Sequence, residues 1–430
     1  MKKLKILIIG SGGREHAIGW KVAQSSRAGE LFFAPGNGGT AGLGKNVDIK
    51  ATDLDALITF AKKENIDLTL ALPDDPLAIG IVDLFTVNGL KIFGPTKSSA
   101  QLESSKSFAK HFMESHNLPT ATFKIFTDFN EAVKYLDSQK LPIVIKASGL
   151  ALGKGVIIAQ TKNEAIEALD NILIKKIFGE AGNEVIIEEF MNGIEISTHV
   201  FSDGKSYSIF PTSQDHKRIG ENDTGLNTGG MGTIAPLSFV TKEILSNIEK
   251  TIISPTLSSM INEKMPFKGV LYPGLMLTEN VSKILEYNVR FGDPETQSYM
   301  RLLGTDILDI FEACINGTLS MINVNWKPIF ACTIVLASGG YPGNYEKDKI
   351  ISGIKDAEEN KNIFVFHAGT KIDEKGNFVT NGGRVLGVSA TGNTLEEALK
   401  YAYEAVSKIS FNGMQYRRDI GQKALKYLNK

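Results

Sequence analysis

Short apolar runs alternate with segments of helical periodicity over residues 4–95, and each run has the length of a buried strand. The runs lie at residues 4–9, 31–34, 68–72 and 91–95. A helix is expected from about Arg14, directly after a glycine turn. Because strands and helices alternate, the pattern predicts a parallel, doubly wound sheet with ligands at the carboxyl ends of its strands. Turns at those ends lie at residues 10–16, 35–39 and 73–76.

The rest of the chain predicts two further domains. Residues 96–120 favour a helical linker that contains Lys106, and a small mixed module follows with strands at 122–126, 143–146, 156–159 and 185–189. After a boundary near Trp326, we expect strands near 331–337, 362–367 and 384–390 and a final helix over 394–409. We therefore predict a multidomain α/β and α+β protein. Its domains are 1–101, 102–325 (with subdomains 121–190 and 191–325) and 326–430.

The segment 212–232 breaks this pattern, since it has almost no apolar residues although hydrophobic runs flank it. It carries Asp215, His216, Lys217 and Arg218 in a row and then five glycines. No helix or half-buried strand has that pattern, so we predict a polar loop. A loop of this length is usually functional, and this one would offer charge and backbone N–H groups to an anionic ligand. A solvated surface loop is the alternative.

Composition excludes several classes of protein. The 430 residues are 42% hydrophobic and 22% charged, with a formal net charge of −1, which argues against nucleic-acid binding by bulk electrostatics. The two cysteines, Cys314 and Cys332, stand in separate apolar contexts, so we expect buried thiols rather than a zinc site or a disulfide. No apolar stretch approaches membrane-spanning length, and a cytoplasmic location is expected.

The turn after the first strand, Gly10-Ser-Gly12-Gly13-Arg14-Glu15-His16, is not a dinucleotide fingerprint, because Glu15 stands where the third glycine is needed. A helix N-terminus with free N–H groups and Arg14 suits one phosphate. A tight turn that only closes the strand–helix unit explains the sequence equally well.

A second glycine-rich segment joins two predicted strands. Lys146 ends one strand, and Gly149-Leu-Ala-Leu-Gly153-Lys154-Gly155 leads into the next. Glycines let a backbone approach phosphate oxygens closely, and lysines supply point charges. Since it opens a strand and not a helix, the segment predicts a phosphate-binding flap rather than a P-loop. A hairpin turn with two exposed lysines is the alternative.

Two further strands carry candidate ligands. The strand through Glu188 runs into a turn where Phe190 and Met191 can pack on an adenine and Glu195 can bind ribose hydroxyls. Near residue 288, period-two spacing puts Glu286, Asn288 and Arg290 on one face and Leu285, Tyr287 and Val289 towards the core. Glutamate and asparagine oxygens suit Mg²⁺ or Mn²⁺, and an arginine beside them can clamp a phosphate or carboxylate. A salt-bridged edge strand is the alternative for this second strand.

Together these features resemble the ATP-grasp enzymes and, more narrowly, the phosphoribosylamine–glycine ligase family, over nearly the whole chain. The motifs that carry the resemblance are Gly-Gly-Arg-Glu-His16, Ala-Pro-Gly-Asn37, Lys-Ile-Phe-Gly-Pro95, Leu-Glu-Ser-Ser-Lys106, Gly-Lys-Gly-Val156, Ser-Gln-Asp-His-Lys-Arg218, Asn-Thr-Gly-Gly-Met-Gly232, Arg-Phe-Gly-Asp-Pro-Glu-Thr-Gln297, Gly-Gly-Tyr-Pro-Gly343, Phe-His-Ala-Gly-Thr370 and Asn-Gly-Gly-Arg384. The 213–218 and 290–297 motifs are the specific ones, because a glycine flap fits any ATP-grasp enzyme. The resemblance implies a Rossmann-like N-terminal domain, an ATP-grasp domain and a C-terminal mixed β domain.

The resemblance also implies the reaction and its residues. ATP, glycine and 5-phosphoribosylamine would give glycinamide ribonucleotide, ADP and phosphate through a glycyl phosphate. ATP would meet Lys106, Lys146, Lys154, Gly149, Gly153, Gly155, Glu188, Phe190, Met191 and Glu195, and the metal would meet Glu286 and Asn288. Substrates would meet Gly12, Gly13, Arg14, Asp74, Asp215 (the glycine ammonium), Arg290, and Lys349 and Arg384 (the 5-phosphate). The implied catalytic residues are Arg290, Asp215, Lys217 and Lys154.

The chain departs from the family pattern at Asp74 (usually Glu), at Ser148 (usually Asp) and at Leu226 (usually Pro), which would leave the loop less rigid. Residues 271–276 offer no second metal carboxylate. Two other functions stay open: an ATP-grasp carboxylase or formate-dependent transferase, and a non-catalytic nucleotide sensor. We expect a monomer, with a weak dimer as the alternative.

Overall fold

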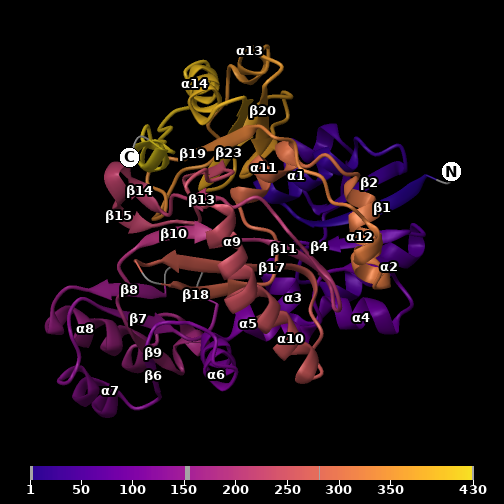
Figure 1. Ribbon diagram of the computed structural model, residues 1–430. Coiled ribbons are helices and arrows are strands. Elements are labelled where there is room, and N and C mark those ends of the chain that lie inside the picture. The colour runs from indigo at the N-terminus through magenta and orange to yellow at the C-terminus, as the bar shows by residue number, and fades with distance from the viewer. Residues whose placement is uncertain (1–2, 151–154, 280, 429–430) are drawn as a thin grey trace.

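The computed structural model describes residues 3–150, 155–279 and 281–428, which form four sheets of four or five strands, two small ribbons and surrounding helices (Figure 1). Gly153 and Lys154, both predicted to bind ATP, lie outside the described residues. Within the described part of the chain, no helix is long and apolar enough to cross a membrane. Short 3₁₀ or π segments are η1 Thr40–Gly42, η2 Asp170–Ile174, η3 Gly179–Gly182, η4 Glu221–Asp223, η5 Glu249–Ile253 and η6 Leu319–Met321.

The N-terminal sheet is parallel and has the strand order β3-β2-β1-β4-β5, which confirms the doubly wound prediction. Its strands are β1 Leu4–Gly10, β2 Ala28–Pro35, β3 Lys45–Asn46, β4 Leu68–Ala71 and β5 Ile92–Phe93, and its helices are α1 Gly13–Val22, α2 Leu54–Lys63, α3 Asp74–Ile79 and α4 Ile81–Val87. The strand order reverses between β1 and β4, and ligands of such sheets bind at that reversal. The turns after these two strands carry Arg14 and Asp74.

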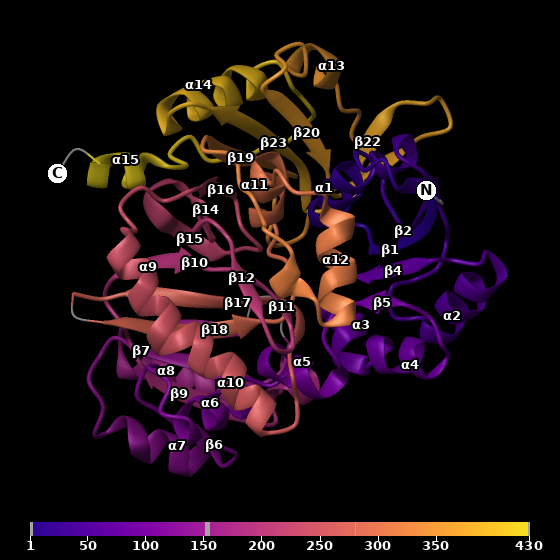
Figure 2. The same cartoon turned by 45° about the vertical axis from the view of Figure 1, so that its right-hand side comes forward.

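The small module has an antiparallel sheet of order β6-β9-β7-β8 and a hydrophobic core of its own. The linker helices are α5 Lys97–Ser104 and α6 Lys106–Ser115; the module contains β6 Phe123–Phe126, α7 Phe129–Leu136, β7 Ile143–Ala147, β8 Val156–Ala159, α8 Lys162–Leu169 and β9 Val185–Glu189. All four predicted strands are confirmed. Figure 2 shows this purple module below the central sheet, away from the C-terminal domain.

The central sheet has the order β10-β17-β11-β12, and β18 pairs with β17. Its elements are β10 Ile194–Ser197, β11 Val200–Asp203, β12 Tyr207–Ile209, α9 Lys242–Ile248, α10 Ser254–Asn262, β17 Lys268–Leu277, β18 Ser282–Asn288, α11 Glu295–Leu302 and α12 Ile307–Asn316. The register between β17 and β18 shifts at Leu285, which has no partner between Ile284 and Glu286. The prediction that Leu285 faces the core is therefore wrong, because this bulge turns it towards the same cavity as Glu286.

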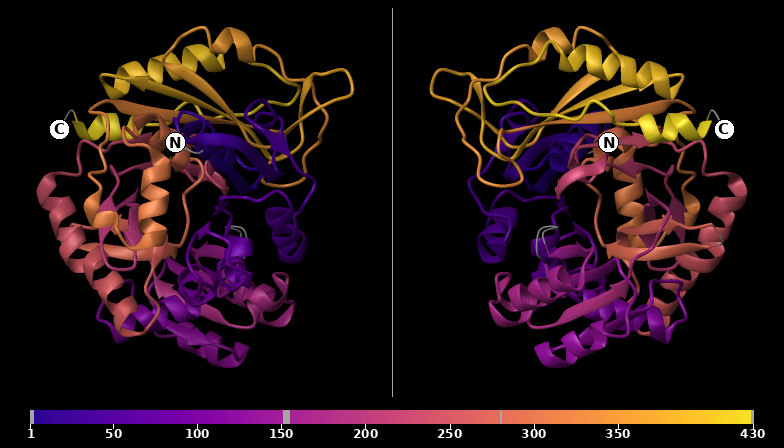
Figure 3. Two further views of the ribbon diagram at one scale, coloured as in Figure 1. Left: turned by 90° about the vertical axis from the view of Figure 1, so that its right-hand side faces the viewer. Right: turned by 90° about the vertical axis from the view of Figure 1, so that its left-hand side faces the viewer.

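The fourth sheet, of order β13-β16-β19-β23-β20, joins strands from both sides of the boundary predicted near Trp326. Its region contains β13 Gln214–Asp215, β14 Arg218–Gly220, β15 Thr224–Asn227, β16 Gly232–Ala235, β19 Phe330–Ala337, α13 Ile354–Ala357, β20 Ile363–His367, β21 Thr370–Ile372, β22 Phe378–Thr380, β23 Arg384–Gly392, α14 Leu395–Val406 and α15 Gln422–Leu428. Figure 3 shows the yellow C-terminal part across the top of the molecule and the purple module at the bottom.

The prediction that residues 212–232 form a loop without strands is wrong. They contain β13, which pairs with β16, and a hairpin of β14 with β15. Polar residues form these strands because the neighbouring sheet and the C-terminal segment satisfy their backbone groups, which periodicity along the chain does not reveal. A helix, α15, also follows the one expected to end the chain.

Candidate active site

One cavity of about 1390 Å³ lies where the N-terminal sheet, small module, central sheet and C-terminal domain meet. Most of the residues predicted from the sequence line it: Arg14, Asp74, Lys106, Lys146, Gly155, Glu188, Phe190, Met191, Glu195, Asp215, Lys217, Glu286, Asn288, Arg290 and Arg384. Gly12, Gly13, Gly149 and Lys349 are described but do not line it. Residues spread over 370 positions of sequence thus converge on one site, from Arg14 to Arg384.

Protein carboxylates occupy the helix N-terminus that was predicted to bind a phosphate. The N–H of Gly12 donates to Glu15 Oε2 at 2.6 Å, and that of Arg14 donates to Asp293 Oδ2 at 3.3 Å. The Arg14 guanidinium donates to Glu15 Oε1 at 2.6 Å and to Phe291 O at 3.1 Å. A Cβ added at Gly13 would overlap the end of the Gln297 side chain, which would then have to move. In this conformation the turn therefore joins the N-terminal and central sheets.

Glu188 is buried between two lysines. Its carboxylate pairs with Lys146 from the neighbouring strand β7 and, at 2.6 Å, with Lys110 from α6. Burial alone would raise the pKa of Glu188, but the two lysines outweigh it and lower the pKa. The side chain thus orients Lys146. Sequence reasoning missed Lys110, although its place one helical turn after Lys106 was a usable signal.

Ser148 explains one departure from the family pattern. Its hydroxyl accepts a hydrogen bond from Ser107 N at 3.1 Å and donates to Ser107 Oγ at 2.9 Å. Next to it, the backbone N–H of Lys106 donates to Ser148 O at 2.8 Å, and Lys106 Nζ donates to Gly149 O at 3.1 Å. Burial lowers the pKa of Lys106. The start of the flap is therefore tied to the N-terminus of α6, and Gly149 has no room for a Cβ, which would lie 2.7 Å from Ala181 Cα.

The end of the cavity near the small module is apolar. Its walls there are Val144, Ile158, Met113, Met191, Met276 and Leu285. Met191 is 8% exposed, whereas Phe190 is 41% exposed at the rim. Apolar walls with a few polar groups at one edge suit a flat aromatic base.

Lys217 pairs with both Glu195, the predicted ribose ligand, and Glu286, the predicted metal ligand. Lys217 Nζ lies 2.5 Å from Glu195 Oε1 and 3.4 Å from Glu286 Oε1. Burial alone would raise the pKa of Glu286, but Lys217, Lys146 and Lys106 lower it to about 2. Glu286 is therefore ionised at neutral pH, and it shares this corner of the cavity with Asn288.

Arg290 is held by an acid that sequence reasoning missed. Its Nη2 lies 2.8 Å from Glu103 Oε1 and donates to Asn288 Oδ1 at 3.2 Å, while its buried Nε has no partner. Glu103 lies in the last turn of α5 and also accepts from Val289 N at 2.8 Å. Burial alone would raise the pKa of Asp74, but Arg290 and Arg14 outweigh it and lower the pKa. The shorter Asp74 side chain thus still reaches the cavity.

Asp215 has a buried carboxylate oxygen, Oδ1, with no hydrogen-bond partner. Burial, and then the nearby Glu295, raise its pKa well above the ordinary value. Glu295 was also missed, and it accepts from Ser197 Oγ at 3.1 Å. An acid with an unsatisfied oxygen and a second acid nearby form a place for a cation.

Of the two phosphate ligands predicted in the C-terminal domain, Arg384 lines the cavity and Lys349 does not. Arg384 Nη1 donates to Asp293 O at 2.7 Å and to Gly229 O, and Tyr341 OH accepts from Gly229 N at 2.9 Å. Arg384 therefore holds the glycines of the 212–232 segment at the cavity wall. Lys349 lies away from the cavity, where it pairs with Glu346 at 2.7 Å.

Lysines from two modules and a carboxylate–amide strand over a shared cavity define an ATP-grasp protein. Residues 4–103, 104–296 and 331–423 match the N, ATP-grasp (A) and C domains of phosphoribosylglycinamide synthetase. The chain therefore belongs to the phosphoribosylglycinamide synthetase family, whose members are ATP-dependent carbon–nitrogen ligases.

Similar proteins agree with this assignment. The chain is 47% identical to the phosphoribosylamine–glycine ligase of Chlorobaculum tepidum, over 98% of this chain and all of that protein. The Pasteurella multocida ligase is 49% identical, with 98% of each chain covered. Among solved structures, the ligase of Thermotoga maritima has a TM-score of 0.85 at 37% identity, covering 97% of this chain and 100% of that one. A biotin carboxylase domain of Hydrogenobacter thermophilus (TM-score 0.73, 14% identity) shares the fold, with 97% and 92% of the chains covered.

Proposed function

We propose that this protein joins glycine to 5-phosphoribosylamine with ATP, giving glycinamide ribonucleotide, ADP and phosphate in purine biosynthesis. The observation that carries the proposal is the unpartnered buried oxygen of Asp215, in a cavity that six lysines also line. Glycine brings an ammonium for Asp215 and a carboxylate for the lysine side of the cavity. Formate and bicarbonate have no ammonium and would leave this acid unpaired.

The route we propose forms a glycyl phosphate. A glycine carboxylate oxygen attacks the γ-phosphorus of ATP, and the bond to the bridging oxygen breaks to release ADP. The amine of phosphoribosylamine then attacks the acyl carbon, phosphate leaves, and the amine nitrogen loses one proton. Lys106 and Lys146 suit the nucleotide phosphates, and the free Nε of Arg290 suits the acyl phosphate. Positioning and charge neutralisation suffice for phosphoryl transfer.

Glu286 and Asn288 would hold the magnesium or manganese ion. Both are oxygen donors on one strand beside the cavity, and Glu286 is ionised, so the donor set fits a hard divalent cation. Among the described residues, no group of three or more His, Cys, Asp or Glu side chains could hold a metal alone. Nucleotide phosphates and water would complete the coordination, and the bound ion would neutralise phosphate charge.

Glycine labelled with oxygen-18 in its carboxylate tests substrate and route together. With ATP, Mg²⁺ and freshly made phosphoribosylamine, one labelled oxygen should appear in the released phosphate. Label found only in the product would refute the glycyl phosphate. ADP formed with formate or bicarbonate but not with glycine would indicate another ATP-grasp enzyme, and no ADP under any condition would indicate a nucleotide sensor. Elution as a monomer in size-exclusion chromatography is expected.

A further inference from the structure

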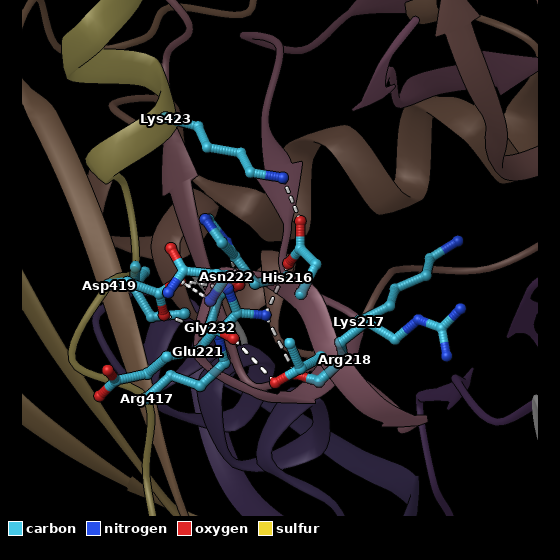
Figure 4. Close-up of polar contacts among 12 residues, drawn as sticks. His216, Lys217, Arg218, Glu221, Asn222, Gly232, Arg417, Asp419 and Lys423 are labelled. Atoms are coloured by element: carbon cyan, nitrogen blue, oxygen red, sulfur yellow. Dashed lines mark hydrogen bonds and ion pairs between the residues drawn. The ribbon is translucent and has the colours of Figure 1, made fainter. Parts of the chain in front are cut away.

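The 212–232 segment is tied to residues 417–423, which we call the C-terminal clamp (Figure 4). Arg417 is the centre of the clamp and is only 1% exposed. Its Nη1 donates to Arg218 O at 3.0 Å and to Asp223 Oδ1 at 2.8 Å. Its Nε and Nη2 donate to both oxygens of Asp419, at 2.8 and 2.7 Å. A guanidinium buried this deeply needs such partners, and two of its four bonds go to the β14–β15 hairpin.

The clamp also contacts the tip of the hairpin, where two residues have a left-handed backbone. Asn222 and Asp223 both have a φ of 55°, a value that asparagine and aspartate adopt more readily than other residues with a side chain. Asn222 N donates to Asp419 Oδ2 at 2.8 Å, and Lys423 pairs with Asp223. These two contacts hold the tip against the clamp.

A third contact anchors the base of the segment. His216 Nδ1 lies 3.0 Å from Gly232 O, so Nδ1 carries the proton, and Nε2 accepts from Gly421 N at 3.2 Å. Burial, together with nearby Arg417, lowers the pKa of His216 to about 4, so the ring is neutral. His216 is thus a structural residue between the 212–232 segment and the clamp.

Lys217 lies between these two anchors. Its carbonyl accepts from Thr228 N at 2.7 Å and from Thr228 Oγ1 at 2.8 Å. The residues on either side, His216 and Arg218, are bonded to the clamp. Figure 4 shows the Lys217 side chain extending away from the clamp. Its ammonium pairs with Glu195 and with Glu286, the predicted metal ligand.

We propose that Arg417 is a positioning residue for the ligase reaction: it holds the hairpin so that Lys217 and Asp215 meet ATP and glycine. This inference rests on the proposed function. Arg417 does not line the cavity, so it acts through Arg218 and Asp223 and through Asp419, which accepts from Asn222 N. Replacing Arg417 should disorder Lys217 and Asp215 relative to Glu286 and Asn288. The small module has its own hydrophobic core and should stay intact.

The test compares Arg417→Gln with Arg301→Gln. Arg301 is a buried arginine of similar exposure, 7%, which donates to the carbonyls of Asn362 and Ser389 and makes no contact with the hairpin. For Arg417→Gln, we expect kcat with glycine to fall about tenfold or more, since hydrogen bonds of a charged group each contribute ~1.5–3 kcal/mol. The Kd of an ATP analogue should change much less than kcat, because Lys106 and Lys146 lie outside the hairpin, and amide exchange in residues 218–227 should accelerate.

The control should lose thermal stability without the change in hairpin exchange. If both variants lose kcat only in proportion to their folded fraction, Arg417 is merely structural and the inference fails. Asp223→Asn offers a milder change in case Arg417→Gln does not fold, because it weakens the pairs of Asp223 with Arg417 and Lys423 but leaves the Arg417–Asp419 pair in place. It should slow kcat with the fold retained, and normal kinetics would overturn the inference. Inactive unmodified protein would instead overturn the proposed function.

Discussion

Two carboxylates in the same cavity, the buried Glu188 and the half-buried Asp215, have opposite surroundings. Glu188 is 3% exposed and has a lysine on each oxygen, which lowers its pKa. Asp215 has an unpartnered oxygen and a second acid nearby, and its pKa is raised. A buried charge is stable only when it is paired, so the two lysines stabilise Glu188 within the protein, and we expect Asp215 to take its cation from the substrate. On this proposal, the number of partners separates a carboxylate that supports the fold from one that binds a ligand.

Of the variants that test this comparison, Glu188→Gln is expected to have the largest effect, a loss of unfolding free energy. It would leave Lys146 and Lys110 buried without their counter-ion, and breaking a buried ion pair costs about 3–5 kcal/mol of unfolding free energy. Urea denaturation would measure the loss, and ATP-analogue binding should weaken because Lys146 loses its orientation. A loss below about 1 kcal/mol, the range of a surface pair, would place Glu188 in the same class as exposed acids.

Asp215→Asn should affect the reaction rather than the fold. Losing a charge-assisted hydrogen bond of about 1.5–3 kcal/mol should lower kcat/KM for glycine by roughly 10- to 150-fold. Steady-state kinetics would measure this, with ATP-analogue affinity as the internal control. Unchanged kcat/KM for glycine would remove Asp215 from the ammonium site.

The pH dependence of stability should also separate the two carboxylates. The pKa of folded Asp215 lies above its ordinary value of 3.8, so ionising it destabilises the fold as pH rises from that value through the folded pKa. Asp215→Asn should therefore gain thermal stability relative to the unmodified protein as pH rises. Melting curves over a pH series would measure the difference, and a constant difference would mean that Asp215 has an ordinary pKa.

The smallest effect is expected at Glu189, the residue after Glu188. Its side chain is 43% exposed and pairs with Lys283 at 2.8 Å. Exposed pairs contribute about 0–1 kcal/mol, so Glu189→Gln should change unfolding free energy by no more than that. It is the matched control for Glu188→Gln, and equal losses in the two variants would refute the role of burial.

Sequence patterns predicted the strands of the small module and the parallel N-terminal sheet, because their apolar runs are local signals. The same reasoning predicted that Glu286, Asn288 and Lys106 belong to the site, since each lies within a recognisable sequence pattern. It failed for residues 212–232, where polar strands depend on distant partners, and for Leu285, where a bulge breaks the alternation. The expected effect of Leu226 on loop rigidity stays a prediction; the residue is 65% exposed in β15.

The sequence by itself determined the family, the order of the domains and a set of candidate site residues, most of which line the cavity, because motifs and periodicity are properties of neighbouring residues. Only the tertiary structure decided which acidic side chain pairs with which basic side chain. Lys110 with Glu188, Glu103 with Arg290 and Arg417 with Asp223 join residues far apart in the chain. Burial and pairing set the free energy of each charge, and both are decided where elements of different domains pack together.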